Sequence, residues 1–290
     1  GTWMSVDISS DEKWIVFDLL AHIYRISSKG GNARALTQET GVALNYHPRY
    51  SPDGKSIAFI SDRAGQNNLW VMDADGSNPR SIFEDLNLRA SHPTWTPDGE
   101  YIIVSRQSVL RGPSRGKDSG IYMYHREGGK GIKIGDNRLQ NANWPSVSED
   151  GKFLFFHKRT PGQAVAWNVS DILQGAINIE RYEFETGEIT SITSGVPSRQ
   201  YRLSSGGAYA PEISPDGRWL AFARRIPDGT ISWKGHEFGP RTALWLRNLL
   251  TGDERVIMDP IEQDMVEGMK TIRVLPGYSW DAKGKSIVLS

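Results

Sequence analysis

The chain has 290 residues, 38% of them hydrophobic, and we find no apolar run of the length that a transmembrane segment needs. Its 34 basic and 34 acidic residues balance, which removes any global argument for binding nucleic acid or an anionic membrane. No cysteine is present, so disulfides and thiolate metal sites are excluded, and the redox compartment stays open.

One tetrapeptide, Ser/Thr-Pro-Asp-Gly, recurs along the chain and predicts a tight turn at each copy. Proline at the first corner fixes φ and glycine accepts a positive φ, so each copy joins two antiparallel strands. The copies lie at 51–54, 96–99 and 214–217, with a Ser-Glu-Asp-Gly form at 148–151 and weaker forms at 9–12 and 281–284.

An apolar run follows each turn and predicts a strand that is buried on both faces. A third, half-buried strand follows after a loop, and a second turn leads to an outer strand. The turns recur at intervals that begin near the ~40–50 residues of a four-stranded propeller blade and lengthen toward the C-terminus. The third strands are expected at 23–26, 69–73, 121–124, 179–182 and 244–247.

The sequence therefore predicts an all-β fold, a single six-bladed β-propeller of four-stranded blades whose last blade is incomplete. Half a blade cannot bury its faces, so we expect this chain to be a fragment of a longer protein. We expect almost no helix. The blades are expected at about 1–40, 46–84, 91–135, 143–194, 208–258 and, in part, 276–290.

No catalytic or metal-binding set is visible. The six histidines include no His-x-His pair and no zincin helix motif, so we expect no metal and no cofactor in this chain. Residues 112–116 fit the Gly-x-Ser-x-Gly pattern around Ser114, but both flanks are loop residues where a hydrolase elbow needs a strand and a helix. We interpret this segment as an inter-strand loop.

The long insertions are expected on one face, opposite the Pro-Asp-Gly turns, which makes that face the candidate binding surface. They are 106–119, 158–178 and 224–241 between strands, and 194–209 and 259–276 between blades. The alternative is that their basic residues pair with nearby acids such as Asp62, Asp228 or Glu237. The candidate binding residues in or beside them are Arg106, Lys158, Arg159, Arg224, Arg225 and Trp233.

His47 and His92 precede a proline at matching places just before the innermost strand of the second and third blades. We expect them at the mouth of the central channel, where they form a candidate binding site. The alternative is that each imidazole caps the backbone of a neighbouring blade. The aromatic residues of the first strands are interpreted as core between blades: Tyr50, Trp95, Trp144 and Trp280.

Residues 47–63 (His-Pro-Arg-Tyr-Ser-Pro-Asp-Gly-Lys-Ser-Ile-Ala-Phe-Ile-Ser-Asp-Arg) and 69–78 resemble the repeat of the TolB-type β-propellers. Residues 1–9 and 15–20 resemble the start of the propeller that precedes the metal-dependent amidohydrolase domain of large bacterial hydrolases. The narrower resemblance implies an accessory, non-catalytic propeller whose partner is a downstream catalytic domain. It also favours a periplasmic or secreted location.

Two alternatives remain open at this point. One is a freestanding TolB-like module that holds a protein partner at the channel mouth. The other is the gating propeller of a prolyl-oligopeptidase-like peptidase. A His-x-His strand beyond Ser290 would select the amidohydrolase, and a Gly-x-Ser-x-Gly elbow would select the peptidase.

Overall fold

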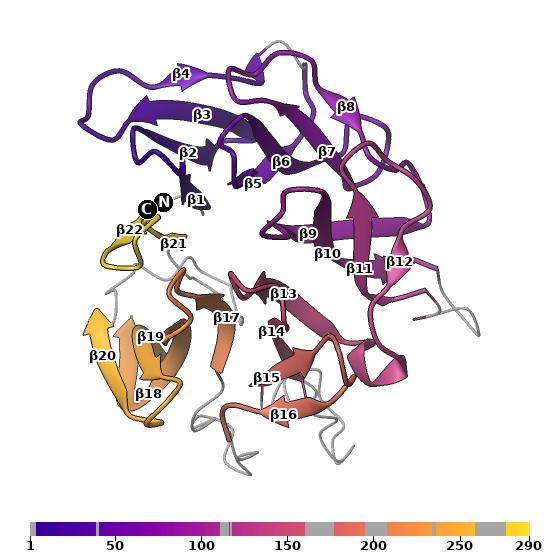
Figure 1. The fold of residues 1–290 in the computed structure, drawn as a ribbon. Helices are drawn as coiled ribbons and strands as arrows, with labels where there is room; N and C mark the ends of the chain where they lie inside the picture. Colours follow the sequence, from indigo (N-terminus) through magenta and orange to yellow (C-terminus); the bar gives the residue numbers. More distant parts are fainter. Residues whose placement is uncertain are drawn as a thin grey trace.

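The computed structural model describes residues 4–38, 41–110, 116, 118–159, 177–194, 208–233, 236–258 and 277–290, with only the backbone path described at 159 and within 225–242. Five four-stranded antiparallel sheets and one two-stranded sheet surround a central axis (Figure 1). The predicted architecture is confirmed: it is an all-β propeller of four-stranded blades with a partial sixth sheet. The described part of the chain contains no helix long and apolar enough to cross a membrane.

Within each blade the strands lie side by side in chain order, with the first strand innermost. Blade 1 comprises β1 (Val6–Ile8), β2 (Trp14–Leu19), β3 (His22–Ser27) and β4 (Arg34–Ala35). Blade 2 comprises β5 (Asn45–Tyr50), β6 (Ser56–Ser61), β7 (Asn68–Asp73) and β8 (Arg80–Ser81). Blade 3 comprises β9 (Leu88–Trp95), β10 (Tyr101–Ser108), β11 (Gly120–His125) and β12 (Ile132–Lys133).

The second half of the ring repeats this plan. Blade 4 comprises β13 (Ala142–Val147), β14 (Phe153–Arg159), β15 (Ile177–Glu183) and β16 (Ile189–Ser191). Blade 5 comprises β17 (Ala208–Ile213), β18 (Trp219–Trp233), β19 (His236–Asn248) and β20 (Glu254–Met258). The partial blade 6 comprises β21 (Tyr278–Trp280) and β22 (Ile287–Leu289). A short 3-10 helix covers Asn137–Leu139.

The Pro-Asp-Gly turns are held by a repeated set of hydrogen bonds. In blade 2 the Ser51 hydroxyl donates to Asp53 Oδ1 at 2.5 Å and accepts from the Ser56 amide at 2.9 Å. Asp53 Oδ1 also accepts from the Lys55 amide at 3.0 Å, and Gly54 has a φ of 68°. The same hydroxyl–aspartate bond recurs in blades 1, 3, 4 and 5. The serine or threonine and the aspartate therefore tie the turn together, and the glycine supplies the positive φ.

The hydrophobic core lies between blades. Ala58, Ile60 and Val71 of blade 2 pack in one cluster with Ile102 and Val104 of blade 3. The second strands supply most of these side chains, because alternate residues of a strand point to opposite faces and both faces are covered by neighbouring blades. This is why the apolar runs after the turns show no polar face.

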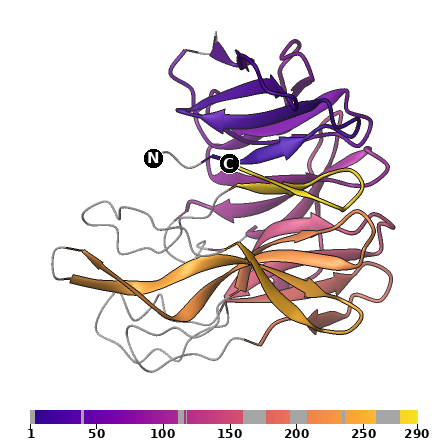
Figure 2. The ribbon, with the colours of Figure 1, turned by 90° about the vertical axis from the view of Figure 1, so that its left-hand side faces the viewer.

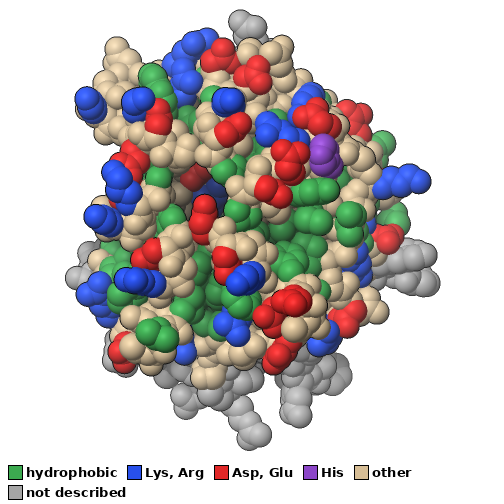
Figure 3. Space-filling view, in the orientation of Figure 1, with side chains coloured by type: hydrophobic (Ala, Val, Ile, Leu, Met, Phe, Trp, Pro, Cys, Tyr) green, Lys and Arg blue, Asp and Glu red, His purple; other side chains and the backbone are tan. Residues whose placement is uncertain are grey.

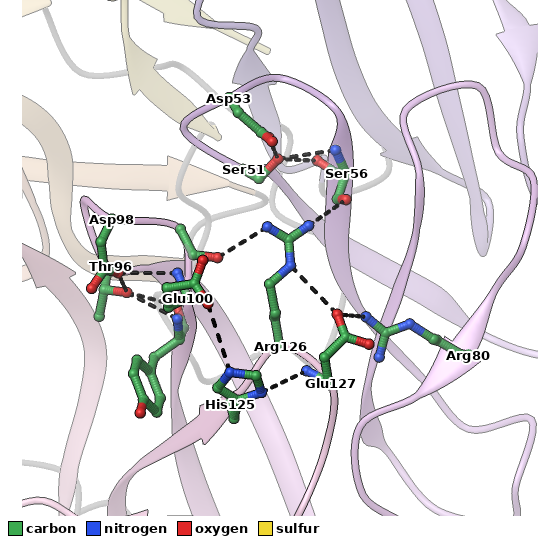
Figure 4. A network of polar contacts seen from close by, with 12 residues as sticks. Ser51, Asp53, Ser56, Arg80, Thr96, Asp98, Glu100, His125, Arg126 and Glu127 are labelled. Atoms are coloured by element: carbon green, nitrogen blue, oxygen red, sulfur yellow. Dashed lines mark hydrogen bonds and ion pairs between the residues drawn. The ribbon is translucent and has the colours of Figure 1, made fainter.

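Arg126 links the turns of blades 2 and 3 on the outside of this core (Figure 4). Its guanidinium donates to the Gly99 carbonyl at 3.2 Å and to the Ser56 hydroxyl at 3.0 Å. It also lies 5.4 Å above the Trp95 ring. Because one side chain contacts two blades, it fixes the spacing between their turns.

Three details of the sequence interpretation are corrected. The innermost strand of blade 2 begins at Asn45, so it contains His47, which was expected just before it. The segment 224–241, expected as a loop, continues the strands: β18 and β19 form a long hairpin that projects beyond the other blades (Figure 2). Trp144 does not share the position of Tyr50, Trp95 and Trp280, because it lies three residues before the end of its strand.

The turn hydrogen bonds generate a prediction about pH. The Thr96 hydroxyl and the Glu100 amide donate to Asp98 and hold the pKa of that carboxyl below its usual value. A carboxyl with a lowered folded pKa stabilises the fold at neutral pH, and this contribution is lost as the pH falls through the folded value. Asp98→Ala should therefore lower the free energy of unfolding by about 1 kcal/mol at pH 7, discounted for the exposure of the turn.

Thermal unfolding of the wild type and of Asp98→Ala from neutral pH to below about pH 4 measures this contribution. The difference in Tm should shrink as the pH falls, because the wild-type carboxyl then binds a proton. A difference that stays constant with pH would contradict this account.

Candidate functional site

The inner strands of blades 2 to 5 each contain a β-bulge at an X-Pro pair. Two residues of the inner strand oppose one residue of the second strand at 47–48, 92–93, 144–145 and 210–211. Proline has no N–H to give to the sheet, so it is accommodated where the pairing breaks. The residue before it has a positive φ in every case: 54° at His47, 52° at His92, 58° at Trp144 and 54° at Ala210.

The amide of each bulge residue points away from its own sheet and donates to the preceding blade. The His47 amide donates to Asp18 Oδ2 at 2.7 Å, the Trp144 amide to Ser105 Oγ at 3.1 Å, and the Ala210 amide to His157 Nδ1 at 3.1 Å. The three acceptors occupy the same position of the second strand in blades 1, 3 and 4. A polar residue at this position thus joins one blade to the next.

Blade 2 lacks this acceptor because Ile60 occupies the position. In blade 2 the His47 ring serves as the acceptor instead: its Nδ1 lies 3.4 Å from the His92 amide nitrogen and accepts a hydrogen bond from it. Burial, together with the charge of Arg49, lowers the pKa of His47 to about 3, so the imidazole is neutral and its Nδ1 can act as an acceptor near pH 7. This geometry is the capping arrangement considered for His47 as an alternative to a binding role.

Three flat side chains from consecutive blades stack on one side of the channel. The His47 and His92 rings lie 4.3 Å apart, and the His92 and Trp144 rings lie 4.0 Å apart. Trp144 therefore extends the row of the two histidines. It also packs against the core cluster of blade 5, so the interpretation as core is right in part. At the matching position blade 5 has Ala210, so the channel is lined unevenly.

A charged cluster crosses the channel next to this stack. Arg49 of blade 2 pairs with Glu212 of blade 5, on the opposite side of the ring, and its Nη1 lies 3.6 Å from Asp7 Oδ1 of blade 1. Basic and acidic side chains are visible inside the central hollow of the space-filling view (Figure 3). Burial raises the pKa of the Glu212 carboxyl, and the Arg49 guanidinium opposes that shift. The ion pair therefore connects blades that share no sheet and no core.

Neighbouring groups fix this cluster in place. Asp7 accepts from the Ser279 hydroxyl at 2.6 Å and from the Tyr50 amide at 2.7 Å. The indole of Trp95 donates to the Arg49 carbonyl at 3.1 Å, and the indole of Trp280 donates to the Glu212 carbonyl at 3.0 Å. Both tryptophans thus reach the blade before their own, and blade 6 is tied to blades 1 and 5.

The basic candidates that the structure describes are engaged within their own blades. Arg106 is buried; it donates to the Tyr124 hydroxyl at 2.8 Å and lies 3.2 Å from the Tyr122 ring centre. Lys158 Nζ is 4.0 Å from Glu180 Oε2. Arg224 pairs with Glu254 and lies over the Phe222 and Trp245 rings. Charge reversal at Arg224 would place two carboxylates together, so it would report on blade 5 rather than on binding.

Other candidates fall where the structure gives no account of the side chain. The side chains of Arg159, Arg225 and Trp233 and the whole of Ser114 lie outside the described residues. Among the residues that are described, no three His, Asp or Glu side chains converge to form a metal site. The described candidates therefore form no single cluster: His47 and His92 share the channel stack, while Arg106, Lys158 and Arg224 lie on three separate blades.

Sequence reasoning missed the residues that join the blades, namely Asp7, Asp18, Arg49 and Glu212. A signal was available for three of them. When the repeats are aligned on the turn, Asp7, Arg49 and Glu212 each lie two residues before its first hydroxyl residue. One basic and two acidic residues at equivalent positions of a closed ring must meet near the axis.

The channel cluster generates a second prediction. Arg49→Met leaves Asp7 and Glu212 without their shared cation and should lower the free energy of unfolding by about 3 kcal/mol at pH 7. The loss should shrink as the pH falls, because burial raises the pKa of Glu212 and the variant lacks the guanidinium that opposes this shift, so the carboxyl binds a proton on folding. Chemical denaturation of both proteins at neutral and mildly acidic pH measures this.

Glu212→Gln is the matched control. This variant keeps the Arg49–Asp7 pair and has a side-chain amide that can accept from Arg49. It should therefore lower the free energy of unfolding by only about 1 kcal/mol. If Arg49→Met were as stable as Glu212→Gln at pH 7, the cluster would not be holding opposite blades together.

Comparisons with known proteins agree with this architecture. The model of the TolB β-propeller domain matches residues 18–179, more than half of the chain. An uncharacterized peptidase of Bacillus subtilis, YuxL, is 26% identical over 220 residues, which are 75% of this chain and 27% of that protein. The Tol-Pal system protein TolB of Wolinella succinogenes is 25% identical over 171 residues, which are 57% of this chain and 38% of that protein.

Among solved structures, a TolB-like protein of Agrobacterium tumefaciens matches with a TM-score of 0.63 and 19% identity. The match covers 88% of this chain and 80% of that protein. That likeness shows the fold alone. The matched part is well under half of the length of either sequence relative. The family match, the blade topology and the repeated turns lead to one conclusion: the chain belongs to the TolB β-propeller family.

Proposed function

We propose that this chain is a non-catalytic binding and scaffold propeller, and that it serves as the accessory N-terminal part of a metal-dependent amidohydrolase-type hydrolase. One observation carries the first half of this proposal. The polar side chains that line the channel, Asp18, Arg49 and Glu212, are engaged with groups of other blades: Asp18 with the next blade and Arg49 with Glu212 across the ring. Groups committed in this way hold a scaffold in shape, and these three side chains are not free to act as a nucleophile or base.

The second half rests on the N-terminal segment, whose residues 1–9 and 15–20 resemble the start of such propellers. One residue of this segment also has a structural role within the propeller. Asp18 accepts from the Ser5 amide at 2.7 Å as well as from the His47 amide, so it joins the start of blade 1 to blade 2. The surface left for a partner is then the face with the long insertions and the projecting β18–β19 hairpin.

A peptidase-associated propeller is the second candidate, and the match to YuxL favours it. A third candidate is an adaptor that binds a protein partner, which the matches to TolB proteins support. The sequence that follows residue 290 in the gene separates the three. A His-x-His strand supports the amidohydrolase, a Gly-x-Ser-x-Gly elbow between a strand and a helix supports the peptidase, and an early stop supports the adaptor.

The non-catalytic role predicts that the purified 290-residue chain hydrolyses neither ester nor amide substrates. Chromogenic esters and peptide anilides, assayed with and without added Zn²⁺ or Mn²⁺, provide the measurement. Ser114→Ala is the control, because Ser114 is the residue of the elbow-like pattern. A wild-type activity that disappears in Ser114→Ala would overturn the proposal.

A further inference from the structure

Exposed aliphatic side chains gather on one face of blades 1 to 3, at the strand ends opposite the Pro-Asp-Gly turns. Val42 is 101% exposed, Leu20 69%, Leu86 65% and Leu44 48%. Leu20 is at the tip of the β2–β3 hairpin, Val42 and Leu44 are in the connection between blades 1 and 2, and Leu86 is in the connection between blades 2 and 3. We call this set, with Val109 and Leu110 after β10, the aliphatic rim.

The loops that carry the rim contact one another from blade 1 to blade 3. The Asn45 amide donates to the Ala21 carbonyl at 3.0 Å, which joins the segment of Leu44 to that of Leu20. The side chain of Leu86 packs over Gly65, where a Cβ would lie 3.0 Å from its Cδ2. The Val109 amide donates to the Asn87 carbonyl at 2.8 Å, which brings blade 3 to the same surface.

The tip of the β2–β3 hairpin departs from ordinary turn chemistry. Leu19 and His22 pair across a two-residue loop, and both loop residues have positive φ: 49° at Leu20 and 70° at Ala21. Such loops normally carry Asn-Gly, because leucine and alanine are strained at positive φ. A strained residue that also exposes its aliphatic side chain fits a role in binding better than a role in folding.

The charges beside the rim show which partner it fits. The loops that carry the rim, and their flanks, contain both acidic and basic residues: Asp62 next to Arg63, and Glu84 and Asp85 near Arg89. Arg63 lies 4.7 Å from the Trp70 ring centre and donates to the Asn45 side chain at 2.7 Å, so much of its hydrogen-bonding capacity is used internally. A border of both signs has no strong preference for an anion or a cation, and the contact must come from apolar surface.

We propose that the aliphatic rim is a docking site for a protein partner that presents aliphatic and aromatic side chains with few charges. This inference rests on the proposed binding function and assigns it to blades 1 to 3, away from the basic candidates of blades 4 and 5. The partner buries Leu20, Val42 and Leu86 together, so its contact surface must span loops of neighbouring blades.

A library of random linear peptides displayed on phage tests this proposal. The library is selected on the immobilised 290-residue chain, and each enriched peptide is titrated against the wild type and the double variant Leu20→Asn with Val42→Ser. Asparagine suits a positive φ and Val42 is fully exposed, so the double variant should keep or raise the wild-type Tm. Leu250→Asn is the matched control, because Leu250 is 92% exposed in the β19–β20 turn of blade 5.

The expected result is enrichment of peptides rich in Leu, Ile, Val, Phe and Trp. Their affinity should fall about tenfold or more in the double variant, because each aliphatic side chain lost from such a contact weakens it substantially. It should not change in Leu250→Asn or between about 0.05 and about 0.5 M NaCl.

Several results would overturn the proposal. The first is that no peptide is enriched over wells without the protein. The second is that the enriched aliphatic peptides bind the double variant as tightly as the wild type. The third is that the enriched peptides are acidic and their binding weakens with salt. Sedimentation that shows a wild-type dimer absent from the double variant would assign the rim to a second copy of the chain instead. Binding at another surface would refute the rim and leave the scaffold function standing, whereas hydrolysis by the isolated chain would refute the scaffold function alone.

Discussion

The propeller depends on a hydrogen-bond acceptor for one backbone amide in each of blades 2 to 5. The X-Pro bulge turns the N–H of residues such as His47 and Trp144 out of the sheet and toward the preceding blade. A buried amide without an acceptor is costly, so the preceding blade must supply one. This requirement explains why a carboxylate, a hydroxyl and an imidazole occupy the same strand position in blades 1, 3 and 4. It also explains the stacked rings, since His47 replaces the acceptor that Ile60 cannot provide.

The same repeat that builds the ring also breaks its symmetry near the axis. Equivalent positions carry Asp7, Arg49 and Glu212, and these three charges meet across the channel. A ring of identical residues could not form such a pair, because like charges would face one another. The divergence of the repeats at this position therefore ties opposite blades together, and it places charged side chains inside the channel at that level.

The sequence predicted well the features that depend on local chemistry. The turn residues and the apolar runs fixed the blade plan, because each turn needs its own proline or glycine and each buried strand needs its own apolar residues. Features that depend on contacts between blades were not predictable one repeat at a time. Arg106, expected as a binding residue on the face with the insertions, is buried against Tyr124, and Trp144 lies beside His92 because a bulge shifts its register. The 224–241 insertion continues its strands, which its loop-like composition did not indicate.

Blades 6 and 1 meet through the close approach of their backbones and share no sheet. A Cβ at Gly277 would lie 2.4 Å from the Met4 carbonyl oxygen and 2.7 Å from the Ser5 Cα. The Ser290 hydroxyl bridges the Gly277 amide at 2.8 Å and the Met4 carbonyl at 3.0 Å. In the described part of the chain, β1 and β21 therefore lie in different sheets and are joined by these contacts. Transient opening of the ring should begin there, so amide protons of β1 and β21 should exchange with solvent sooner than those of the second strands of blades 2 to 5.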